Sequence, residues 1–239
     1  MTTINKLKAF ICKRIRRLLG VDWIHDYQRD LLDQQHFLQS VSSVIHVGAN
    51  SGYERELYDR FGLKVLWIEP LPKVFEQLKE NLAEFRRQHA IQALVTDIDG
   101  QKYDFHVASN NGASSSIFEL NEHKEIWPDV EFVETISLES KTLASLLNEQ
   151  GFDPSDFEAL IMDTQGSELL VLKGAESMLK HFRFIKTEVA DFDSYSGSCT
   201  VDDIDDFMRS HKFRRFSCQR FARRKGGGAY YDITYRNIG

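Results

Sequence analysis

Short apolar runs alternate with helix-like stretches from residue 43 onward, and this alternation constrains the fold more than any other feature of the sequence. Helical patterns are expected from about residue 53, over about 73–87 and from about residue 166. The apolar runs between them, each of strand length, are residues 44–47, 65–68, 91–95, 157–162 and 184–189. Strands that alternate with helices form a parallel sheet with helices on its faces. The sequence therefore predicts an α/β, doubly wound, Rossmann-like domain.

One long segment interrupts the alternation. Residues of about 101–138 contain two further strand patterns, at 103–107 and 130–136, with a small polar run between them. Strand patterns without an intervening helix do not continue a parallel sheet. We expect this segment to form added strands and a loop that lie over the sheet.

The C-terminal region also departs from the alternation. Strand patterns at 213–218 and 230–235 flank the basic, glycine-rich stretch 223–228. Two strand patterns joined by such a stretch are typical of an antiparallel hairpin. The last strand is therefore expected to run against the others.

Length and charge bound the domain organisation. The 239 residues accommodate one large domain, expected over 41–239, with an N-terminal extension over 1–40. Residues 1–21 carry six basic and no acidic side chains, so that segment is +6 and, with −6 for the whole chain, the remainder is −12. Because an acidic body repels phosphate backbones, nucleic acid is a poor candidate partner.

The N-terminal extension contains two helical patterns, at about 4–19 and about 23–39. The first is basic and amphipathic. It either packs on the domain with a solvated basic face or docks on an anionic membrane surface.

Cysteine usage and hydropathy favour a cytoplasmic protein, peripheral on the inner face of the membrane if the first helix docks there. Cys12, Cys199 and Cys218 have neither zinc-site nor disulfide spacing. No apolar run reaches the roughly 20 residues of a membrane span.

The strand at 44–47 runs directly into Gly48-Ala49-Asn50-Ser51-Gly52. In such folds ligands bind at the carboxyl ends of the strands, where glycines let the backbone approach the ligand. Glu69 closes the next strand, where a carboxylate can accept hydrogen bonds from both hydroxyls of a ribose. This pair predicts an adenosine-containing cofactor. A plain glycine-rich turn with a solvated Glu69 is the alternative.

Glycine spacing separates two classes of adenosine cofactor. A dinucleotide GxGxxG pattern that starts at Gly48 would have glycines at positions 50 and 53, but the chain has Asn50 and Tyr53. GxxxG suits a cofactor without a pyrophosphate, whose amino-acid end lies against the turn. A methyl donor is favoured, and a NAD-binding oxidoreductase stays open as an alternative.

Four blocks of sequence follow one another over residues of about 43–190. They are Val44-Ile45-His46-Val47-Gly48-Ala49-Asn50-Ser51-Gly52, Ile68-Glu69-Pro70-Leu71-Pro72, Ala113-Ser114-Ser115-Ser116, and a block from Ile161 to Glu176 that begins Ile161-Met162-Asp163-Thr164-Gln165-Gly166. With these blocks the chain resembles the FkbM family of S-adenosylmethionine (SAM)-dependent methyltransferases. The resemblance implies the class I methyltransferase fold, a seven-stranded, mostly parallel sheet with an antiparallel last strand. It also implies SAM as cofactor and O-methylation of a hydroxyl on a sugar, glycan, glycolipid or related metabolite.

Two positions depart from the pattern of this family. The family usually has an acid where this chain has His46, and commonly a glutamate where it has Gln165. An acid at position 46 would hold the methionine ammonium, so either His46 contacts it through a neutral nitrogen or other groups do so. With a glutamine at 165, that position cannot supply a general base. A cofactor-binding module without catalysis is therefore a further alternative.

Methyl transfer to a hydroxyl needs an aligned acceptor and a base, and it needs no metal. Asp163, at the end of a central strand, is the first catalytic candidate, with a helix-capping acid as its alternative. Glu188 ends the next strand, with Asp191 and Asp193 close behind, and could bind acceptor hydroxyls or be a loop acid. His106 is a candidate base or a packing histidine.

Further residues have weaker assignments. Glu168 is expected to be an acid at a helix start, and His123 a packing histidine. A role in the site is the alternative for each. No metal is expected, although Asp163, Glu188 and Asp191 together could hold Mg²⁺. The expected cofactor contacts are His46, Gly48, Asn50, Ser51, Gly52, Glu69, Pro70, Leu94, Ser115 and Asp163.

Overall fold

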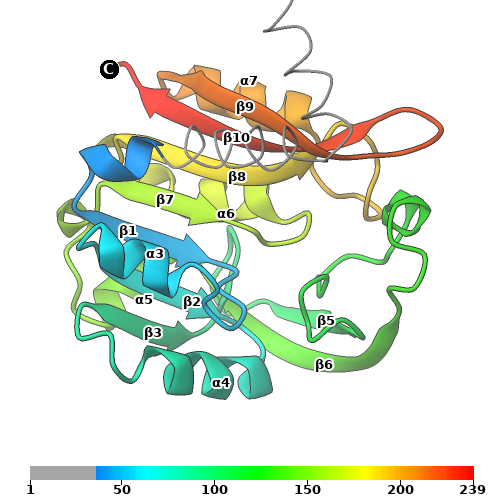
Figure 1. Ribbon diagram of the computed structural model, residues 1–239, viewed down its shortest axis with the longest axis horizontal. Helices are drawn as coiled ribbons and strands as arrows, with labels where there is room; N and C mark the ends of the chain where they lie inside the picture. Colours follow the sequence, from blue (N-terminus) through cyan, green and yellow to red (C-terminus); the bar gives the residue numbers. More distant parts are fainter. Residues whose placement is uncertain (1–35) are drawn as a thin grey trace, which may run out of the picture. The chain divides into compact units, whose positions relative to one another are not determined.

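The computed structural model describes residues 36–239 (Figure 1). Leu38–Gly239 forms one compact unit. The basic helix expected over about 4–19 lies outside the described residues, and so does the expectation that it docks on a membrane. Most of the helix expected over about 23–39 lies outside them as well. Its described end is the short 3-10 helix η1, His36–Ser40. None of the helices within residues 36–239 has the length and apolarity of a bilayer span.

The centre of the fold is a seven-stranded sheet of order β3-β2-β1-β7-β8-β10-β9. Its strands are β1 (Ser43–Val47), β2 (Lys64–Glu69), β3 (Gln88–Gln92), β7 (Ala159–Met162), β8 (Phe184–Ala190), β9 (Phe213–Arg223) and β10 (Ala229–Asn237). The pairs among β3, β2, β1, β7 and β8 are parallel, whereas β10 is antiparallel to β8 and β9. This confirms the predicted sheet. The last strand lies inside the sheet because β9 takes the edge.

Helices cover both faces of the sheet. They are α3 (Arg55–Arg60), α4 (Pro72–Leu82), α5 (Leu143–Glu149), α6 (Glu168–Gly174) and α7 (Val201–Ser210), with 3-10 helices η2 (Glu122–Glu125), η3 (Pro154–Asp156) and η4 (Glu176–His181). Apolar side chains of α5, α6 and α7 share one core with β1, β2, β7 and β8. Tyr58 of α3 packs on Trp67 of β2 on the opposite face. The sequence analysis did not predict α5 or α7.

A smaller sheet of order β4-β6-β5 carries the predicted insertion. Its strands are β4 (Leu94–Val95), β5 (Lys102–Ala108) and β6 (Phe132–Lys141). The single strand expected over 91–95 is therefore wrong, because the chain leaves the large sheet after Gln92 and joins β6 at Leu94.

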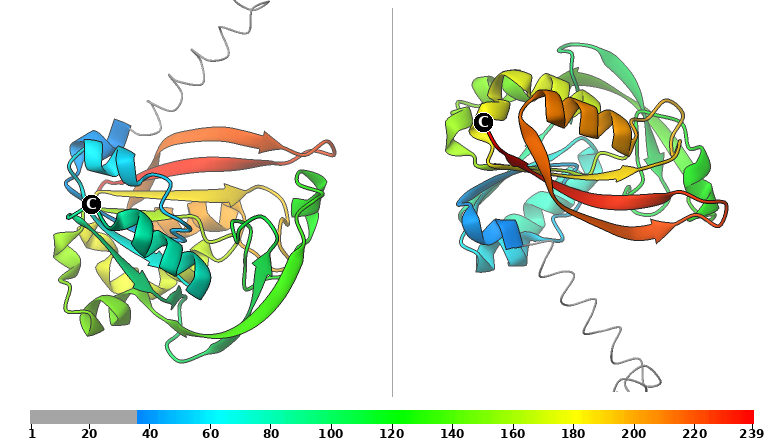
Figure 2. Two further views of the ribbon diagram at one scale, coloured as in Figure 1. Left: turned by 60° about the horizontal axis from the view of Figure 1, so that its bottom comes forward. Right: turned by 90° about the horizontal axis from the view of Figure 1, so that it is seen from above.

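The insertion and the β9–β10 hairpin lie at the same edge of the domain. Both extend past the carboxyl ends of the parallel strands (Figure 2). Strand order reverses between β1 and β7, so the carboxyl ends of these two strands flank a crevice. The site is expected in that crevice.

Candidate active site

The loop after β1 brings its backbone against the end of β7. Gly48 has a φ of +80°, and a Cβ there would lie 1.8 Å from the carbonyl oxygen of Asp163. Gly52 has a φ of +72°, and its Cβ would lie 2.7 Å from a methyl of Leu78 in α4. Close packing and backbone conformation thus both require glycine.

Glu69 fixes the shape of this loop from the end of β2. Its two carboxylate oxygens accept backbone N–H bonds from Asn50 at 2.8 Å and from Leu71 at 2.9 Å. Burial raises the pKa of Glu69 to about 7, although both N–H bonds act in the opposite direction. Each oxygen keeps a second lone pair, so the carboxylate can still accept from two hydroxyls of a ligand.

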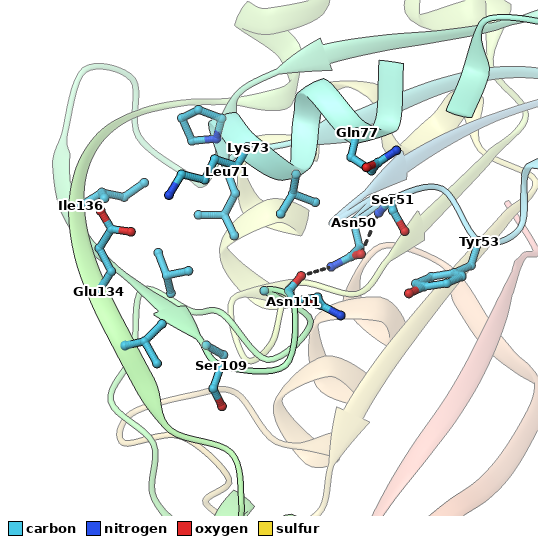
Figure 3. Close-up of a pocket in the computed structure, with 16 residues that line it drawn as sticks. Asn50, Ser51, Tyr53, Leu71, Lys73, Gln77, Ser109, Asn111, Glu134 and Ile136 are labelled. Carbon is cyan, nitrogen blue, oxygen red and sulfur yellow. Dashed lines mark hydrogen bonds between the residues drawn. The ribbon is translucent and has the colours of Figure 1, made fainter. Parts of the chain in front are cut away.

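A cavity of about 130 Å³, here called the cofactor cavity, lies between this loop, the end of β2 and segment 112–115. Seven of the ten expected cofactor contacts line it: Gly48, Asn50, Glu69, Pro70, Leu94, Ser115 and Asp163. Ser51 instead lines a neighbouring hollow of about 770 Å³ (Figure 3). Gly52 supports the loop from beneath, against Leu78.

Some lining residues were missed by sequence reasoning. Tyr53, Leu71, Phe105 and Thr164 all line the cofactor cavity. The alternation of the 103–107 strand shows that Phe105 shares a face with Tyr103 and Val107, but not which face meets a ligand. From the sequence, Tyr53 stood out only because it occupies a glycine position of the dinucleotide pattern.

His46 does not line the cofactor cavity, so the structure does not bring it to the contact with the methionine ammonium that was one of the two alternatives. Val47 lines the cavity, and successive side chains of a strand point to opposite faces. His46 stacks on Trp67 with ring centroids 4.8 Å apart, and its Nδ1 lies 3.1 Å from the hydroxyl of Tyr58. Burial lowers the pKa of His46 to about 4, so it is a neutral packing residue.

Asp163 lies at the carboxyl end of β7 and lines the cofactor cavity. Its Oδ1 accepts a 2.6 Å hydrogen bond from the side-chain amide of Gln165, whose own carbonyl accepts from the Tyr195 hydroxyl at 2.7 Å. Burial raises the pKa of Asp163 to about 7; the Gln165 bond opposes this rise, and nearby carboxylates, Glu168 first, add to it. Asp163 is thus an oriented carboxylate that titrates near neutral pH.

Glu168 has a structural part in this arrangement. Its Oε1 accepts from the backbone and the hydroxyl of Thr164 at 2.9 and 3.0 Å, and its Oε2 accepts from the N–H of Gly166 at 3.1 Å. Gln165 between them has a φ of +53°. The carboxylate therefore clamps the turn that presents Gln165 to Asp163.

Glu188 lies beside Asp163 at the same edge of the sheet. It faces Asp232 across the β8–β10 pair, whereas Asp232 bonds to Lys186 at 2.8 Å. Burial, then Asp163 and Asp232, raise the pKa of Glu188 well above its usual range. With Gln165, Glu188 lines a cavity of about 10 Å³, room for one water or one hydroxyl.

Asp191 and Asp193 are engaged elsewhere. Asp191 accepts from the N–H of Ala229 at 2.6 Å and from the Tyr231 hydroxyl at 3.0 Å, while Asp193 accepts from the Asn121 amide at 2.7 Å. Neither aspartate lines the small cavity beside Glu188. No group of three or more potential metal ligands occurs within residues 36–239.

Neither of the two candidate histidines lines the cofactor cavity. His106 points to the face of β5 opposite Phe105, where it stacks on Phe132 at 4.9 Å and lies 3.1 Å from the Thr135 hydroxyl. His106 is therefore not brought to the cofactor cavity, contrary to the expectation of a base there. His123 is buried with its Nδ1 2.7 Å from the Tyr230 hydroxyl, and burial lowers its pKa to about 4.

Comparison with known families shows the family of the chain. The sequence model of the methyltransferase FkbM domain matches residues 46–215, which include the Gly48 loop, Glu69, Asp163 and Glu188. The chain belongs to the FkbM methyltransferase family. This membership decides against the NAD-binding oxidoreductase considered above. No curated protein matches the sequence.

Solved structures of low sequence identity share the fold of this FkbM protein. Magnesium protoporphyrin IX methyltransferase from Synechocystis PCC 6803, with bound SAM, matches with a TM-score of 0.50 and 10% identity over 95% of this chain and 84% of that chain. An O-methyltransferase from Bacillus cereus in complex with S-adenosylhomocysteine (SAH) matches with a TM-score of 0.49 and 13% identity. This match covers 93% of this chain and 90% of that chain. An uncharacterized protein from Listeria monocytogenes matches with a TM-score of 0.47 and 6% identity. This match covers 82% of this chain but 61% of that chain. The chain thus spans less than two thirds of that last protein.

Family and fold indicate SAM as the cofactor, and the residues of the cofactor cavity fit it. Glu69 offers acceptors for ribose hydroxyls, while Leu71, Leu94 and Phe105 form an apolar surface for a purine. The cavity, at 130 Å³, is smaller than the roughly 300–1,000 Å³ of most ligand pockets. It adjoins a hollow of about 770 Å³ that shares Asn50, Tyr53, Leu71 and Gly112 with it.

Proposed function

We propose that this FkbM protein is an O-methyltransferase that methylates a hydroxyl of a sugar, glycan, glycolipid or related metabolite. The observation that carries the proposal is Asp163, a carboxylate at the cofactor cavity with a pKa raised to about 7. A hydroxyl must lose its proton as its oxygen is methylated, and a base that titrates near the working pH does this most effectively. A carboxylate acceptor would need no such base.

Each nearby residue has a stated part in the proposed reaction. SAM, when bound, supplies an electrophilic methyl group. Asp163 receives the acceptor proton at Oδ2, because Gln165 occupies Oδ1. The Tyr195 hydroxyl fixes the orientation of the Gln165 amide, so that its NH₂ and not its carbonyl faces Asp163.

Glu188 supports the acceptor in this scheme. No hydrogen-bonding side chain within residues 36–239 is seen on its carboxyl group, which faces the single-hydroxyl cavity beside Gln165. Burial raises its pKa and so favours the protonated carboxyl, the form that can donate to an acceptor oxygen. Positioning of the acceptor by Asp163 and Glu188 together would supply the alignment that methyl transfer needs.

The two departures from the family pattern do not remove this chemistry. His46 packs on Trp67, behind the cavity. Gln165 orients Asp163 by a hydrogen bond, so Asp163 is the only carboxylate of the Asp163–Gln165 pair. A cofactor-binding module without catalysis would have no need of a base poised in this way. The enzyme is therefore favoured over the module without catalysis.

The direct test is a search for the linkage that the protein makes. Purified full-length protein is incubated with SAM labelled with ¹³C at the methyl group and with neutral carbohydrate and glycolipid fractions of cells that lack the gene. We expect a labelled methyl ether, which survives both mild base and acid hydrolysis of glycosidic bonds. Label that mild base releases would be a methyl ester, and label on nitrogen would be an amine; either product contradicts O-methylation of a hydroxyl.

A further inference from the structure

The β9–β10 hairpin carries a charge opposite to that of the domain around it. Residues 212–231 contain seven basic and no acidic side chains, whereas residues 22–239 as a whole have a net charge of −12. β9 is an edge strand of the large sheet, and the turn of the hairpin projects past the end of β8 (Figures 1 and 2). A concentrated positive charge therefore lies at one edge of an acidic domain.

Most of this charge is not neutralised by acids of the domain. Arg215 donates to Asp205 of α7 at 2.7 Å. Arg224 donates to Glu122 and to Glu125 of η2. The other five basic side chains are exposed and form no ion pair within residues 36–239: Lys212, Arg214, Arg220, Arg223 and Lys225. These five cations can meet an external anionic partner.

Two phenylalanines stand among these cations. The ladder between β9 and β10 skips Phe216 and Phe221, so each is the extra residue of a β-bulge. Their side chains are 42% and 43% exposed. Phe216 lies against Arg236 of β10, and Phe221 lies against Tyr230 of the same strand. Because residues an even number of positions apart on a strand share a face, both phenylalanines lie on one face of the sheet edge.

Protection of the edge strand does not account for these phenylalanines. Bulges and charged side chains keep an edge strand from pairing with another chain, and β9 has both. A polar residue at the extra position of each bulge would serve that purpose better than an exposed aromatic ring. Aromatic and basic side chains presented together are instead the features with which a protein surface binds an anionic bilayer. The rings enter the interface, and the cations meet the lipid phosphates.

A nucleic acid fits this edge less well than a bilayer does. Aromatic residues that bind single strands offer an open ring face on which a base stacks. One face of Phe216 is covered by the Arg236 guanidinium at 5.9 Å, and the ring of Phe184 lies 5.4 Å away at 71°. A nucleic-acid chain would also continue past the hairpin onto a domain of negative charge. A flat bilayer can meet the projecting edge alone.

We propose that the β9–β10 edge is a docking surface for an anionic lipid bilayer, with Phe216 and Phe221 among the headgroups and the unpaired cations of β9 on lipid phosphates. Charges farther away than about 8 Å are largely screened at physiological ionic strength, so the acidic remainder of the domain does not cancel this attraction. None of the residues of this edge lines the cofactor cavity. Docking therefore goes beyond the proposed methyl transfer and is tested independently of it.

The first test measures co-sedimentation of the full-length protein with sucrose-loaded vesicles. Vesicles of phosphatidylcholine alone are compared with vesicles of equal parts phosphatidylcholine and phosphatidylglycerol. Arg220→Gln/Arg223→Gln removes two cations of the edge, and Arg60→Gln/Arg86→Gln, at exposed positions outside the hairpin, is the matched control. We expect binding to the anionic vesicles only. Arg220→Gln/Arg223→Gln should weaken it about thirtyfold, a factor of about five for each cation, and the control should weaken it far less.

A second measurement locates the contact, because residues 1–21 are basic as well. In the Cys12→Ser/Cys218→Ser protein, Phe221→Cys places a nitrobenzoxadiazole label on the edge, since Cys199 is buried and does not react. Anionic vesicles should increase the emission of this label and shift it to shorter wavelength, and neutral vesicles should leave it unchanged.

Three results would overturn the assignment of this surface. The first is equal binding of anionic vesicles by the wild type and by Arg220→Gln/Arg223→Gln. The second is a label at position 221 that does not respond while the protein binds vesicles. The third is binding of an RNA oligonucleotide that Arg220→Gln/Arg223→Gln abolishes, in a protein that does not bind anionic vesicles; the edge would then be a nucleic-acid surface.

Discussion

The side-chain amide of Gln165 donates a 2.6 Å hydrogen bond to Oδ1 of Asp163 and is itself held by the Tyr195 hydroxyl at 2.7 Å. A glutamine is suited to this place because it donates on one side and accepts on the other. A carboxylate there would face Asp163 across the same short distance, and two carboxylates so close cannot both be ionised.

Substitution Gln165→Glu is therefore expected to raise the pKa of Asp163 further. The new carboxylate removes a hydrogen bond to the ionised form and adds a like charge, so both changes act in one direction. We expect an upward shift of about one pH unit or more in the Asp163 titration, followed by NMR in protein with ¹³C-labelled aspartate carboxyls. Asp163→Asn identifies the signal. A downward shift would show that Gln165 does not orient Asp163 as described.

Tyr195→Phe provides a milder version of the same test. It removes the anchor of the Gln165 amide but leaves the amide present, so the pKa of Asp163 should rise less than in Gln165→Glu. Tyr231→Phe is the control, because that hydroxyl bonds to Asp191 and not to Gln165. An equal effect of both substitutions on Asp163 would contradict the anchoring role.

Asp163→Asn should stabilise the fold at alkaline pH. In the folded protein the pKa of Asp163 is raised to about 7 from 3.8, so the folded state holds the proton more tightly than the unfolded state does. The stability of the wild type therefore falls as pH rises from about 4 to about 7, and the asparagine avoids this loss. We expect a Tm above that of the wild type at pH 8, by about 2–4 °C for each kcal/mol relieved, and no gain at pH 4. A constant Tm difference across this range would argue against a raised pKa.

Gly48→Ala tests the close contact between β1 and β7. Its Cβ would lie 1.8 Å from the Asp163 carbonyl, whereas a Cβ at Gly151, which has a similar φ of +73°, meets nothing within 4 Å. Gly151→Ala thus isolates the backbone strain, roughly 1–2 kcal/mol. We expect Gly48→Ala to lower the free energy of unfolding by clearly more and to abolish SAH binding, as measured by urea unfolding and calorimetry. Equal losses in the two variants would refute the contact argument.

His46→Asn tests the corrected place of His46. Because the side chain stacks on Trp67 behind the cavity, its replacement should lower Tm but leave the SAH dissociation constant unchanged at a temperature where the variant is folded. Glu69→Ala, in contrast, removes the acceptor of two backbone N–H groups in the cofactor loop and should weaken SAH binding strongly. A large loss of affinity in His46→Asn would restore a direct contact with the cofactor.

Much of the large sheet follows from sequence because the central strands β1, β2 and β7 are buried on both faces. The run 44–47 and its GxxxG loop locate β1, and Glu69 marks the end of β2. An unbroken apolar run does not show which face of the sheet His46 takes. It also does not show that the run 91–95 leaves the large sheet and joins the small sheet around Ala93.

Other features depend on contacts that no local pattern encodes. Helix α5 has seven residues and α7 has ten, too short for a strong periodic signal. The bridge from Asp163 through Gln165 to Tyr195 requires a turn with positive φ, clamped by Glu168, and a tyrosine 30 residues further along the chain. The strand pattern at 103–107 does not say which face meets the site, and His106 takes its alternative role as a packing histidine against Phe132.

The central claim is that Asp163 takes the proton of a hydroxyl acceptor, and its most direct test compares methyl-ether formation by the wild type and by Asp163→Asn with the same carbohydrate fractions. We predict a rate loss of about 10²–10⁴-fold, with SAH binding retained, because the asparagine keeps the hydrogen bond with Gln165 but cannot accept the proton. Methyl-ether formation by Asp163→Asn at the rate of the wild type would contradict the account.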